Sequence, residues 1–268
     1  ILCYTIRMKV VISGLVKQEL AAYIRKHYRR TIQIVKTKPE FVLCYGGDGT
    51  LLYAERHYPL VPKVMIRHSR VCAKCATLAK ETILELMVRG QYSLVEQPLL
   101  ETTHGGKTLY AINDILVAHA NINTGLRYHL WLNGENFGGE LLGDGLVVAT
   151  PLGGTGYYQS ITRSTFQQGL GIAFNNSIFT IGNLVVPEDT IVKVRIDRGP
   201  AVVAADNNDL YLPLHNKDTV TIRRSHRSTY IVYFSGQHYK KYNVGIGDNR
   251  VPLGSCQMCG KLLVDKLA

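Results

Sequence analysis

The stretch FVLCYGGDGT, residues 41–50, decides how the first part of the chain folds. Its first half, Phe41–Tyr45, is a short apolar run typical of a buried strand. Gly-Gly-Asp-Gly-Thr follows directly, and Leu51–His57 then continues as a predicted helix. A strand that leads through a glycine-rich turn into a helix aims backbone N–H groups at a phosphate. We therefore predict an α/β unit that binds phosphate at residues 46–50.

The aspartate of this turn is the candidate catalytic residue. Glycine lets the backbone approach phosphate oxygens closely, so Gly46, Gly47, Gly49 and the adjoining Thr50 are candidate phosphate-side residues. Asp48 would lie beside the phosphates, where a carboxylate orients or deprotonates a hydroxyl, or holds Mg²⁺. The alternative is an Asp-Gly turn that only caps a helix.

A second strand, loop and helix pattern stands about a hundred residues later. Leu146–Ala149 is a predicted strand, and it enters a loop rich in glycine and threonine, residues 150–156, before a predicted helix from Tyr157. The loop glycines, Gly153 among them, permit close approach of a ligand, and hydroxyls are supplied by Thr150, Thr155 and Ser160. The alternative is a glycine-rich β-turn without a ligand.

A polar pair interrupts an apolar strand between these two loops. Asn113 and Asp114 stand between Ile112 and Ile115, and their side chains could contact a ribose or a base edge. The alternative is a turn between two strands.

The predicted secondary-structure pattern changes near residue 92. Residues 1–92 alternate strand and helix patterns, whereas residues 93–236 contain short β-rich runs separated by turn signals, such as Thr108–Ala118. Asn133-Gly134 is a hairpin signal. We expect an N-terminal α/β domain, a C-terminal β-rich domain that binds a nucleotide, and a tail, residues 237–268.

From about Phe41 to Asp206 the order of these segments resembles the NAD kinase family. Gly-Gly-Asp-Gly alone also occurs in lipid kinases and phosphofructokinases, so the Thr150–Tyr157 segment favours NAD kinases. The resemblance implies an α/β Rossmann-like N-terminal domain and a C-terminal β-sandwich-like domain. It also implies a tail that returns to the N-terminal domain, and a homodimer or homotetramer.

The resemblance implies an activity as well, the phosphorylation of the adenosine 2′-hydroxyl of NAD. The donor would be ATP or polyphosphate, with Mg²⁺ or another divalent metal. Asp48 would be the catalytic aspartate, and Asn113 and Asp114 would contact adenosine. By the same resemblance, Asp144 stands near the nicotinamide end and Asp206 matches a later site aspartate. Thr155, Tyr157 and Ser160 would form the nucleotide-side loop.

Four departures from the family pattern leave other functions open. The Asn113-Asp114 pair replaces Asn-Glu, Gly156 replaces alanine, and Asn207 rather than glycine follows Asp206. Residues 67–75 replace a Gly-x-Leu-Gly-Phe stretch. The alternatives are a lipid or other small-alcohol kinase and an inactive nucleotide-binding regulator. Basic residues of the replaced segment would contact phosphate or belong to a solvated loop: Arg67, His68 and Arg70.

Two C-x-x-C pairs indicate a metal site. Cys72 and Cys75 form one pair, and Cys256 and Cys259 form the other. Four cysteines of this spacing could hold a structural zinc, and the tail expected from the resemblance would bring the pairs together. The alternatives are a disulfide in either pair or two unconnected reduced pairs.

The charge balance favours anionic partners. Lys and Arg number 31 against 20 Asp and Glu, a net charge of +11, which attracts polyanions such as nucleotides or, as a distant alternative, nucleic acid. The other interpretation is a basic solvated surface. The sequence contains no apolar stretch of membrane-spanning length and no secretory signal pattern, so we expect a cytoplasmic protein.

Overall fold

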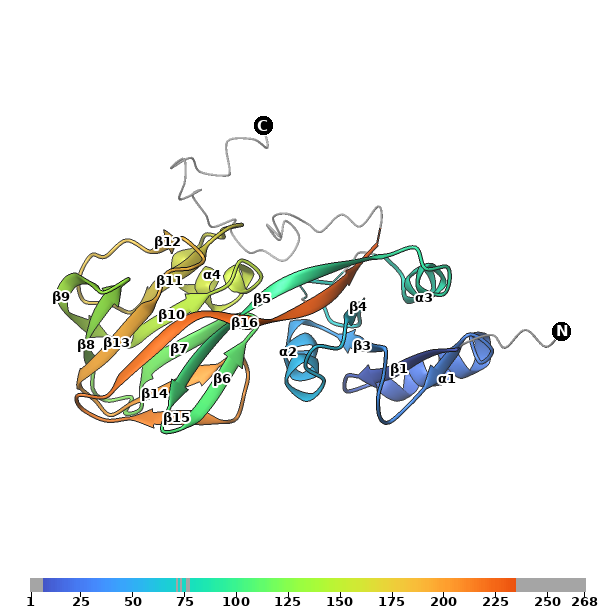
Figure 1. Ribbon diagram of the computed structural model, residues 1–268, viewed down its shortest axis with the longest axis horizontal. Helices are drawn as coiled ribbons and strands as arrows, with labels where there is room; N and C mark the ends of the chain where they lie inside the picture. Colours follow the sequence, from blue (N-terminus) through green and yellow to red (C-terminus); the bar gives the residue numbers. More distant parts are fainter. Residues whose placement is uncertain (1–6, 71, 73, 76–77, 235–268) are drawn as a thin grey trace, which may run out of the picture. The chain divides into compact units, whose positions relative to one another are not determined.

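The computed structural model describes residues 7–70, 72, 74, 75 and 78–234 (Figure 1). These residues divide into two compact units. Unit 1 contains the described residues up to Gln97 and from Ser228 onward, and unit 2 contains Pro98–Arg227. The chain passes from unit 1 to unit 2 within β5 (Ser93–His104) and returns within β16 (Thr219–Tyr233). The expected tail, residues 237–268, lies outside the described residues.

Unit 1 is an α/β unit built on a parallel sheet. The strand order is β2-β1-β3-β4, and the end of β16 pairs in parallel with β4 through Ile231 and Lys63. Its strands are β1 (Met8–Ser13), β2 (Ile32–Ile34), β3 (Phe41–Gly46) and β4 (Lys63–Arg67). Its helices are α1 (Lys17–His27), α2 (Asp48–His57) and α3 (Lys80–Val88).

The core of unit 1 explains why residues 41–45 form a central strand. All five residues of that run are buried, as expected for a parallel strand covered on both faces. The helices add apolar side chains to this core, among them Leu20 of α1 and Leu84 of α3. Leu51 of α2 is buried as well. The α/β expectation for the N-terminal region is thus confirmed.

Unit 2 is a sandwich of antiparallel strands. One sheet has the order β12-β11-β10-β7-β14-β15, and the other contains β16, β13, β8 and β9, with β5 and β6 attached. Inward residues of both sheets form one apolar core, which includes Leu130, Val148 and Val194. The remaining bounds are β6 (Lys107–Ala111), β7 (Asp114–His119), β8 (Leu126–Leu132), β9 (Glu135–Gly143), β10 (Gly145–Ala149), β11 (Leu170–Asn175), β12 (Leu184–Val186), β13 (Val192–Arg198), β14 (Ala201–Ala205) and β15 (Tyr211–Leu214).

Turn chemistry places the strand boundaries. Asn133 and Gly134 have φ of 51° and 89°, and they join β8 to β9 as the hairpin signal predicted. The β-rich run Thr108–Ala118 breaks at Ile112 and Asn113 into β6 and β7, so the alternative of a turn between two strands at the Asn-Asp pair is confirmed. Two short helical elements follow β10, a 3₁₀ turn η1 (Gly153–Thr155) and α4 (Tyr157–Thr162).

Candidate functional site

The first cluster of candidate residues lies in unit 1, at the turn between β3 and α2. Gly46 ends β3, Gly47 precedes the helix, and Asp48 is the first residue of α2, with Gly49 and Thr50 in the same turn. A Cβ at Gly46 would lie 2.2 Å from the Thr50 hydroxyl oxygen and would force Thr50 to move. The Asp48 carboxylate therefore stands at the positive end of the helix dipole and at the carboxyl end of a parallel strand, where α/β proteins bind ligands.

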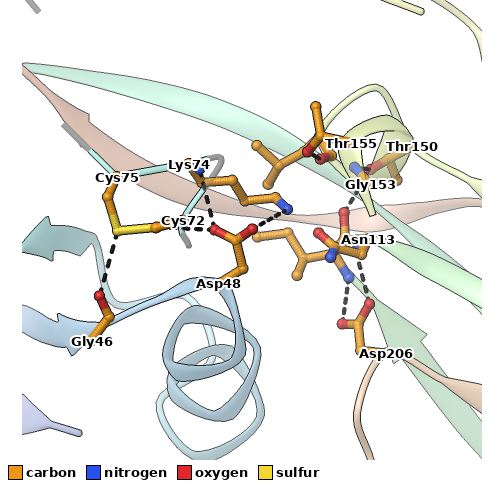
Figure 2. A network of polar contacts seen from close by, with 12 residues as sticks. Gly46, Asp48, Cys72, Lys74, Cys75, Asn113, Thr150, Gly153, Thr155 and Asp206 are labelled. Atoms are coloured by element: carbon orange, nitrogen blue, oxygen red, sulfur yellow. Dashed lines mark hydrogen bonds and ion pairs between the residues drawn. A yellow bond between two sulfur atoms is a disulfide. The ribbon is translucent and has the colours of Figure 1, made fainter. Parts of the chain in front are cut away.

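Three contacts reach the Asp48 carboxylate from the segment after β4 (Figure 2). The backbone N–H of Lys74 donates to Oδ1 at 3.2 Å, and the Lys74 ammonium lies 3.7 Å from Oδ2. The Cys72 sulfur lies 3.1 Å from Oδ1. The Lys74 side chain is 5% exposed and that of Asp48 is 30% exposed, so the carboxylate is accessible while the lysine beside it is buried.

The first cysteine pair is a disulfide. Cys72 and Cys75 are bonded, with their Cα atoms 5.5 Å apart. A disulfide sulfur carries no hydrogen, so the approach of Cys72 to Asp48 and that of Cys75 to the Gly46 carbonyl oxygen, 3.6 Å, are contacts rather than hydrogen bonds. Cys256 and Cys259, the other half of the predicted zinc site, lie outside the described residues. Within the described part of the chain, no group of three or more His, Cys, Asp or Glu side chains could hold a metal ion.

The basic side chains near this turn have contacts within the segment itself. The Arg67 guanidinium donates to the carbonyl oxygens of Ser69, at 3.1 Å, and Arg70, at 2.8 Å. The His68 ring lies 4.5 Å from the Tyr45 ring, centroid to centroid. Arg67 thus stabilises the bend that follows β4, which brings the chain back toward Asp48.

The second cluster lies in unit 2, where three predicted acidic and amide residues meet. The Asp206 carboxylate accepts hydrogen bonds from three backbone N–H groups, those of Ile112 at 2.9 Å, Asn113 at 2.8 Å and Asp114 at 3.1 Å. Three N–H donors satisfy this carboxylate and fix the backbone of the Asn-Asp pair. Asp206 has φ of 50°, a left-handed conformation that aspartate tolerates better than most residues. Its role is therefore to position Asn113 and Asp114.

The glycine-rich loop after β10 packs onto the same backbone. The Thr150 hydroxyl donates to the Ile112 carbonyl oxygen at 2.6 Å and accepts the Gly153 N–H at 3.0 Å. The Thr150 N–H donates to the Asn113 carbonyl oxygen at 2.8 Å. A Cβ at Gly153 would lie 2.1 Å from that same oxygen, so only glycine fits. Figure 2 shows this loop above Asn113 and Asp206.

The side chain of Asn113 is the most informative polar group of unit 2. Asn113 is 6% exposed, and its Oδ1 atom is buried without a hydrogen-bond partner. A Cβ at Gly156 would lie 3.7 Å from Asn113 Nδ2 and 3.8 Å from Asp114 Oδ2. A buried acceptor without a donor is costly, and a ligand that supplies an N–H or O–H group would relieve that cost.

The hydroxyls of the nucleotide-side loop have local partners. The Thr155 hydroxyl donates to the Leu152 carbonyl oxygen at 3.4 Å, and the Ser160 hydroxyl donates to the Tyr157 carbonyl oxygen at 2.7 Å. The Tyr157 hydroxyl accepts from the Asn175 amide at 3.1 Å, and Tyr157 is 38% exposed. Each hydroxyl oxygen keeps lone pairs that can accept a hydrogen bond from a ligand.

Asp144 lies in the tight link between β9 and β10. Its Oδ2 accepts the Asn176 side-chain amide at 2.6 Å, and its backbone N–H donates to the Asn175 carbonyl oxygen at 2.9 Å. Neither asparagine was predicted as a site residue, and neither was Lys74. An Asn-Asn pair that ends an apolar strand was the available signal for the first two, and a lysine between two cysteines was the signal for the third.

Comparison with known families and sequences gives one consistent result. Residues 112–234 match the family model of the ATP-NAD kinase C-terminal domain. The NAD kinase of Thermomicrobium roseum is 29% identical over 221 residues, which cover 78% of this chain and 75% of that protein. The NAD kinase of Caldicellulosiruptor saccharolyticus is 27% identical over 183 residues, which cover 63% of this chain and 67% of that protein.

Solved structures show that the fold is shared. An NAD kinase from Archaeoglobus fulgidus in complex with ATP has a TM-score of 0.70 at 19% identity and covers 87% of this chain and 95% of its own. Yeast NADH kinase complexed with NADH has a TM-score of 0.71 at 13% identity and covers 91% of this chain and 89% of its own. The expected fold class, an α/β domain followed by a β-sandwich-like domain, is thus confirmed.

Proposed function

Because the chain belongs to the NAD kinase family, we propose that it transfers the terminal phosphoryl group of ATP to the adenosine 2′-hydroxyl of NAD, giving NADP and ADP. The observation that carries this proposal is the accessible Asp48 carboxylate at the start of α2, in a Gly-Gly-Asp-Gly turn. Polyphosphate as an alternative donor, and NADH as an alternative acceptor, are decided by the assay below.

Asp48 would act on the hydroxyl that attacks. Its carboxylate takes the proton of the 2′-hydroxyl while the oxygen forms a bond to the γ-phosphorus of ATP. The bond between that phosphorus and the β,γ-bridging oxygen breaks, and ADP leaves with the electron pair. Positioning and neutralisation of charge supply most of the rate in such transfers.

A divalent metal fits Asp48 as one of its ligands. The carboxylate is 30% exposed and stands at a turn suited to phosphate. Mg²⁺ commonly takes one or two carboxylates, substrate phosphates and water, so a preformed cluster of protein ligands is not needed. When bound, the metal would supply positive charge at the phosphates.

Unit 2 would bind the nucleotide. The buried Asn113 Oδ1 atom needs a donor, and an amino or hydroxyl group of adenosine provides one. Gly156 leaves the Asn113 amide and the Asp114 carboxylate uncovered by a methyl group. The other proposed contacts are Gly46, Gly47, Gly49 and Thr50 on the phosphate side, and Asp144, Thr150, Gly153, Thr155, Tyr157 and Ser160 on the nucleotide side. Asp206, predicted as a contact, would instead hold the backbone of Asn113 and Asp114 in place.

The test is turnover by the purified chain with NAD, ATP and Mg²⁺, followed as NADP formed. We expect product, and we expect Asp48→Asn to lower kcat by at least about 100-fold because the proton acceptor is lost. Asp209→Asn, a matched change at an exposed aspartate, should leave kcat unchanged. No product with ATP or polyphosphate, from either NAD or NADH, would refute the proposal. Phosphorylation of a lipid alone would favour a lipid kinase.

A nucleotide-binding regulator without kinase activity is the second candidate. The contacts that already cover part of the Asp48 carboxylate favour it. Lys74 and Cys72 both lie against the carboxylate that a substrate hydroxyl would have to reach. Binding of NAD or NADP measured by calorimetry, in a chain that yields no product, would establish this alternative.

The cysteine pairs carry a separate proposal. Once reduced, Cys72 and Cys75 would supply two of the four thiolates of a structural zinc, with Cys256 and Cys259 as the other two. Elemental analysis should give one zinc per chain in a reduced preparation, and thiol titration should count the remaining thiols. A stable reduced chain without zinc would rule this site out.

Assembly and location stay predictions. We propose a homodimer or homotetramer, as the resemblance implies, to be checked by light scattering of the eluted chain. In the described part of the chain, no helix is both long and apolar enough to cross a membrane. The expected cytoplasmic location is tested by fractionation of cells.

A further inference from the structure

The buried lysine beside Asp48 is a feature that the proposed function does not use. The Lys74 side chain is 5% exposed although it ends in an ammonium group. Burial of an ammonium group costs several kcal/mol unless partners compensate, so an apolar residue would be cheaper at this position. The burial of Lys74 is therefore not explained by packing alone, and its neighbour Asp48 suggests a reason for it.

Lys74 contacts both oxygens of the Asp48 carboxylate. Its backbone N–H donates to Oδ1 at 3.2 Å, and its ammonium lies 3.7 Å from Oδ2. Figure 2 shows the main chain and the side chain of Lys74 approaching the carboxylate from the same residue. Two contacts from one residue fix the rotation of the carboxylate plane, which a single contact would leave free.

The distances distinguish the two oxygens. Oδ1 is in hydrogen-bond range of Lys74 and in contact with Cys72. The ammonium lies beyond hydrogen-bond range of Oδ2 and attracts this oxygen by charge.

We propose that Lys74 is a positioning residue for the phosphoryl transfer. It holds the plane of the Asp48 carboxylate in the orientation in which the carboxylate meets the hydroxyl that attacks. This proposal rests on the proposed function, because it concerns the same carboxylate. It also gives the substituted segment after β4 a function that the C-x-x-C spacing alone does not suggest.

A double-mutant cycle tests the proposal. Lys74→Met keeps the length and removes the charge, and it should lower kcat about 10- to 100-fold with little change in KM for NAD or ATP, because the carboxylate loses its orientation. Lys74→Arg should recover part of the rate. In the Asp48→Asn background, Lys74→Met should cause little further loss, because a residue that acts through Asp48 has nothing left to position.

Lys80→Met is the matched control. Lys80 lies in the same unit and pairs with the carboxylate of Glu19, at 2.9 Å, rather than with that of Asp48. Its loss should leave kcat within about twofold of the unmodified chain. Wild-type turnover in Lys74→Met would overturn the proposal. Multiplicative losses in the double variant would overturn it too, since Lys74 would then act on the substrate directly.

A measurement without turnover separates this proposal from the proposed function. The ¹⁵Nζ resonance of Lys74, assigned by its disappearance in Lys74→Met, should move in Asp48→Asn, whereas that of Lys80 should stay in place. No movement of the Lys74 resonance would show that the pairing is absent and would sink the proposal. If the chain makes no NADP but the resonance moves, the proposed function fails while the orienting contact stands.

Discussion

At the scale of single residues, two aspartates of the candidate sites have opposite roles. Asp206 accepts hydrogen bonds from three backbone N–H groups, so its carboxylate fixes the main chain at residues 112–114. Asp48 is contacted mainly by one neighbouring segment and stays 30% exposed. A carboxylate whose lone pairs are filled by the backbone positions its neighbours, whereas an accessible one can accept a proton.

The glycine that touches Asn113 leads to a prediction on stability. In Gly153→Ala the new Cβ would lie 2.1 Å from the Asn113 carbonyl oxygen, a backbone atom that cannot rotate away. Overpacking of this kind costs about 1–3 kcal/mol of unfolding free energy, and the displaced Asn113 should also weaken binding of NAD. Urea unfolding and calorimetry provide the two measurements.

Gly182→Ala is the control for that change. A Cβ at Gly182 meets nothing within 4 Å, so the same substitution should leave stability and NAD affinity close to their original values. Equal effects of the two substitutions would contradict the clash that we infer at Gly153.

At the scale of elements, a surface network joins α1, β3 and α3. The Glu19 carboxylate of α1 accepts a hydrogen bond from the Lys80 ammonium at 2.9 Å and another from the Tyr45 hydroxyl at 2.8 Å. The hydrogen bond from Lys80, and then that from Tyr45, lowers the pKa of Glu19 below its ordinary 4.5. Burial, followed by the bond to Glu19, raises the pKa of Tyr45.

This network predicts how stability depends on pH. Because the folded pKa of Glu19 is lowered, its stabilising contribution is present above pH 4.5 and is lost as pH falls through the folded value. The difference in Tm between the unmodified chain and Glu19→Gln should therefore shrink on acidification. Glu96→Gln, at an exposed glutamate of β5, should show no such dependence. A Glu19 difference that stays constant into acid would contradict the assignment.

Elements with clear local patterns could be predicted from sequence. The apolar run before Gly46 and the hairpin at Asn133-Gly134 have local causes, and both were confirmed. The break between β6 and β7 was one of two interpretations of the Asn-Asp pair, and sequence alone could not decide between them, because Asp206, more than 90 residues away in sequence, holds the backbone there. Strand β9 has mostly exposed residues and three glycines, so it lacks the alternation that marks a strand.

The residues of the candidate site were likewise predicted from sequence only in part. Glycine spacing identified the turn at Asp48, and the structure places its residues together. The contacts of Lys74 were missed, because they depend on how the chain folds back after β4 rather than on any local motif.

At the scale of the whole molecule, a buried cluster ties the last described strand to unit 1. The Lys63 ammonium of β4 is fully buried and donates to the Glu55 carboxylate, the Tyr58 carbonyl oxygen and the Thr229 hydroxyl of β16. The Thr229 hydroxyl in turn donates to Glu55. All three partners are needed because an ammonium has three donors and no water reaches them.

Removal of the Thr229 hydroxyl should weaken this cluster. Thr229→Val keeps the shape but leaves a donor of Lys63 and an acceptor of Glu55 without their partner, which costs about 1–3 kcal/mol of unfolding free energy. Urea unfolding followed by circular dichroism measures it. Thr221→Val, at a half-exposed threonine of the same strand, should change stability by less than about 0.5 kcal/mol. Equal losses would show that the cluster adds nothing beyond strand propensity.

The same cluster has a consequence for synthesis on the ribosome. Lys63 and Thr229 are 166 residues apart in sequence. At about 5–20 residues per second, the partner of Lys63 is made roughly 8 to 33 seconds after Lys63 itself. During that interval β4 has an uncovered edge on the side that β16 later occupies. The sheet of unit 1 is therefore completed only after unit 2 has been made, and a nascent chain needs protection from pairing with others until β16 arrives.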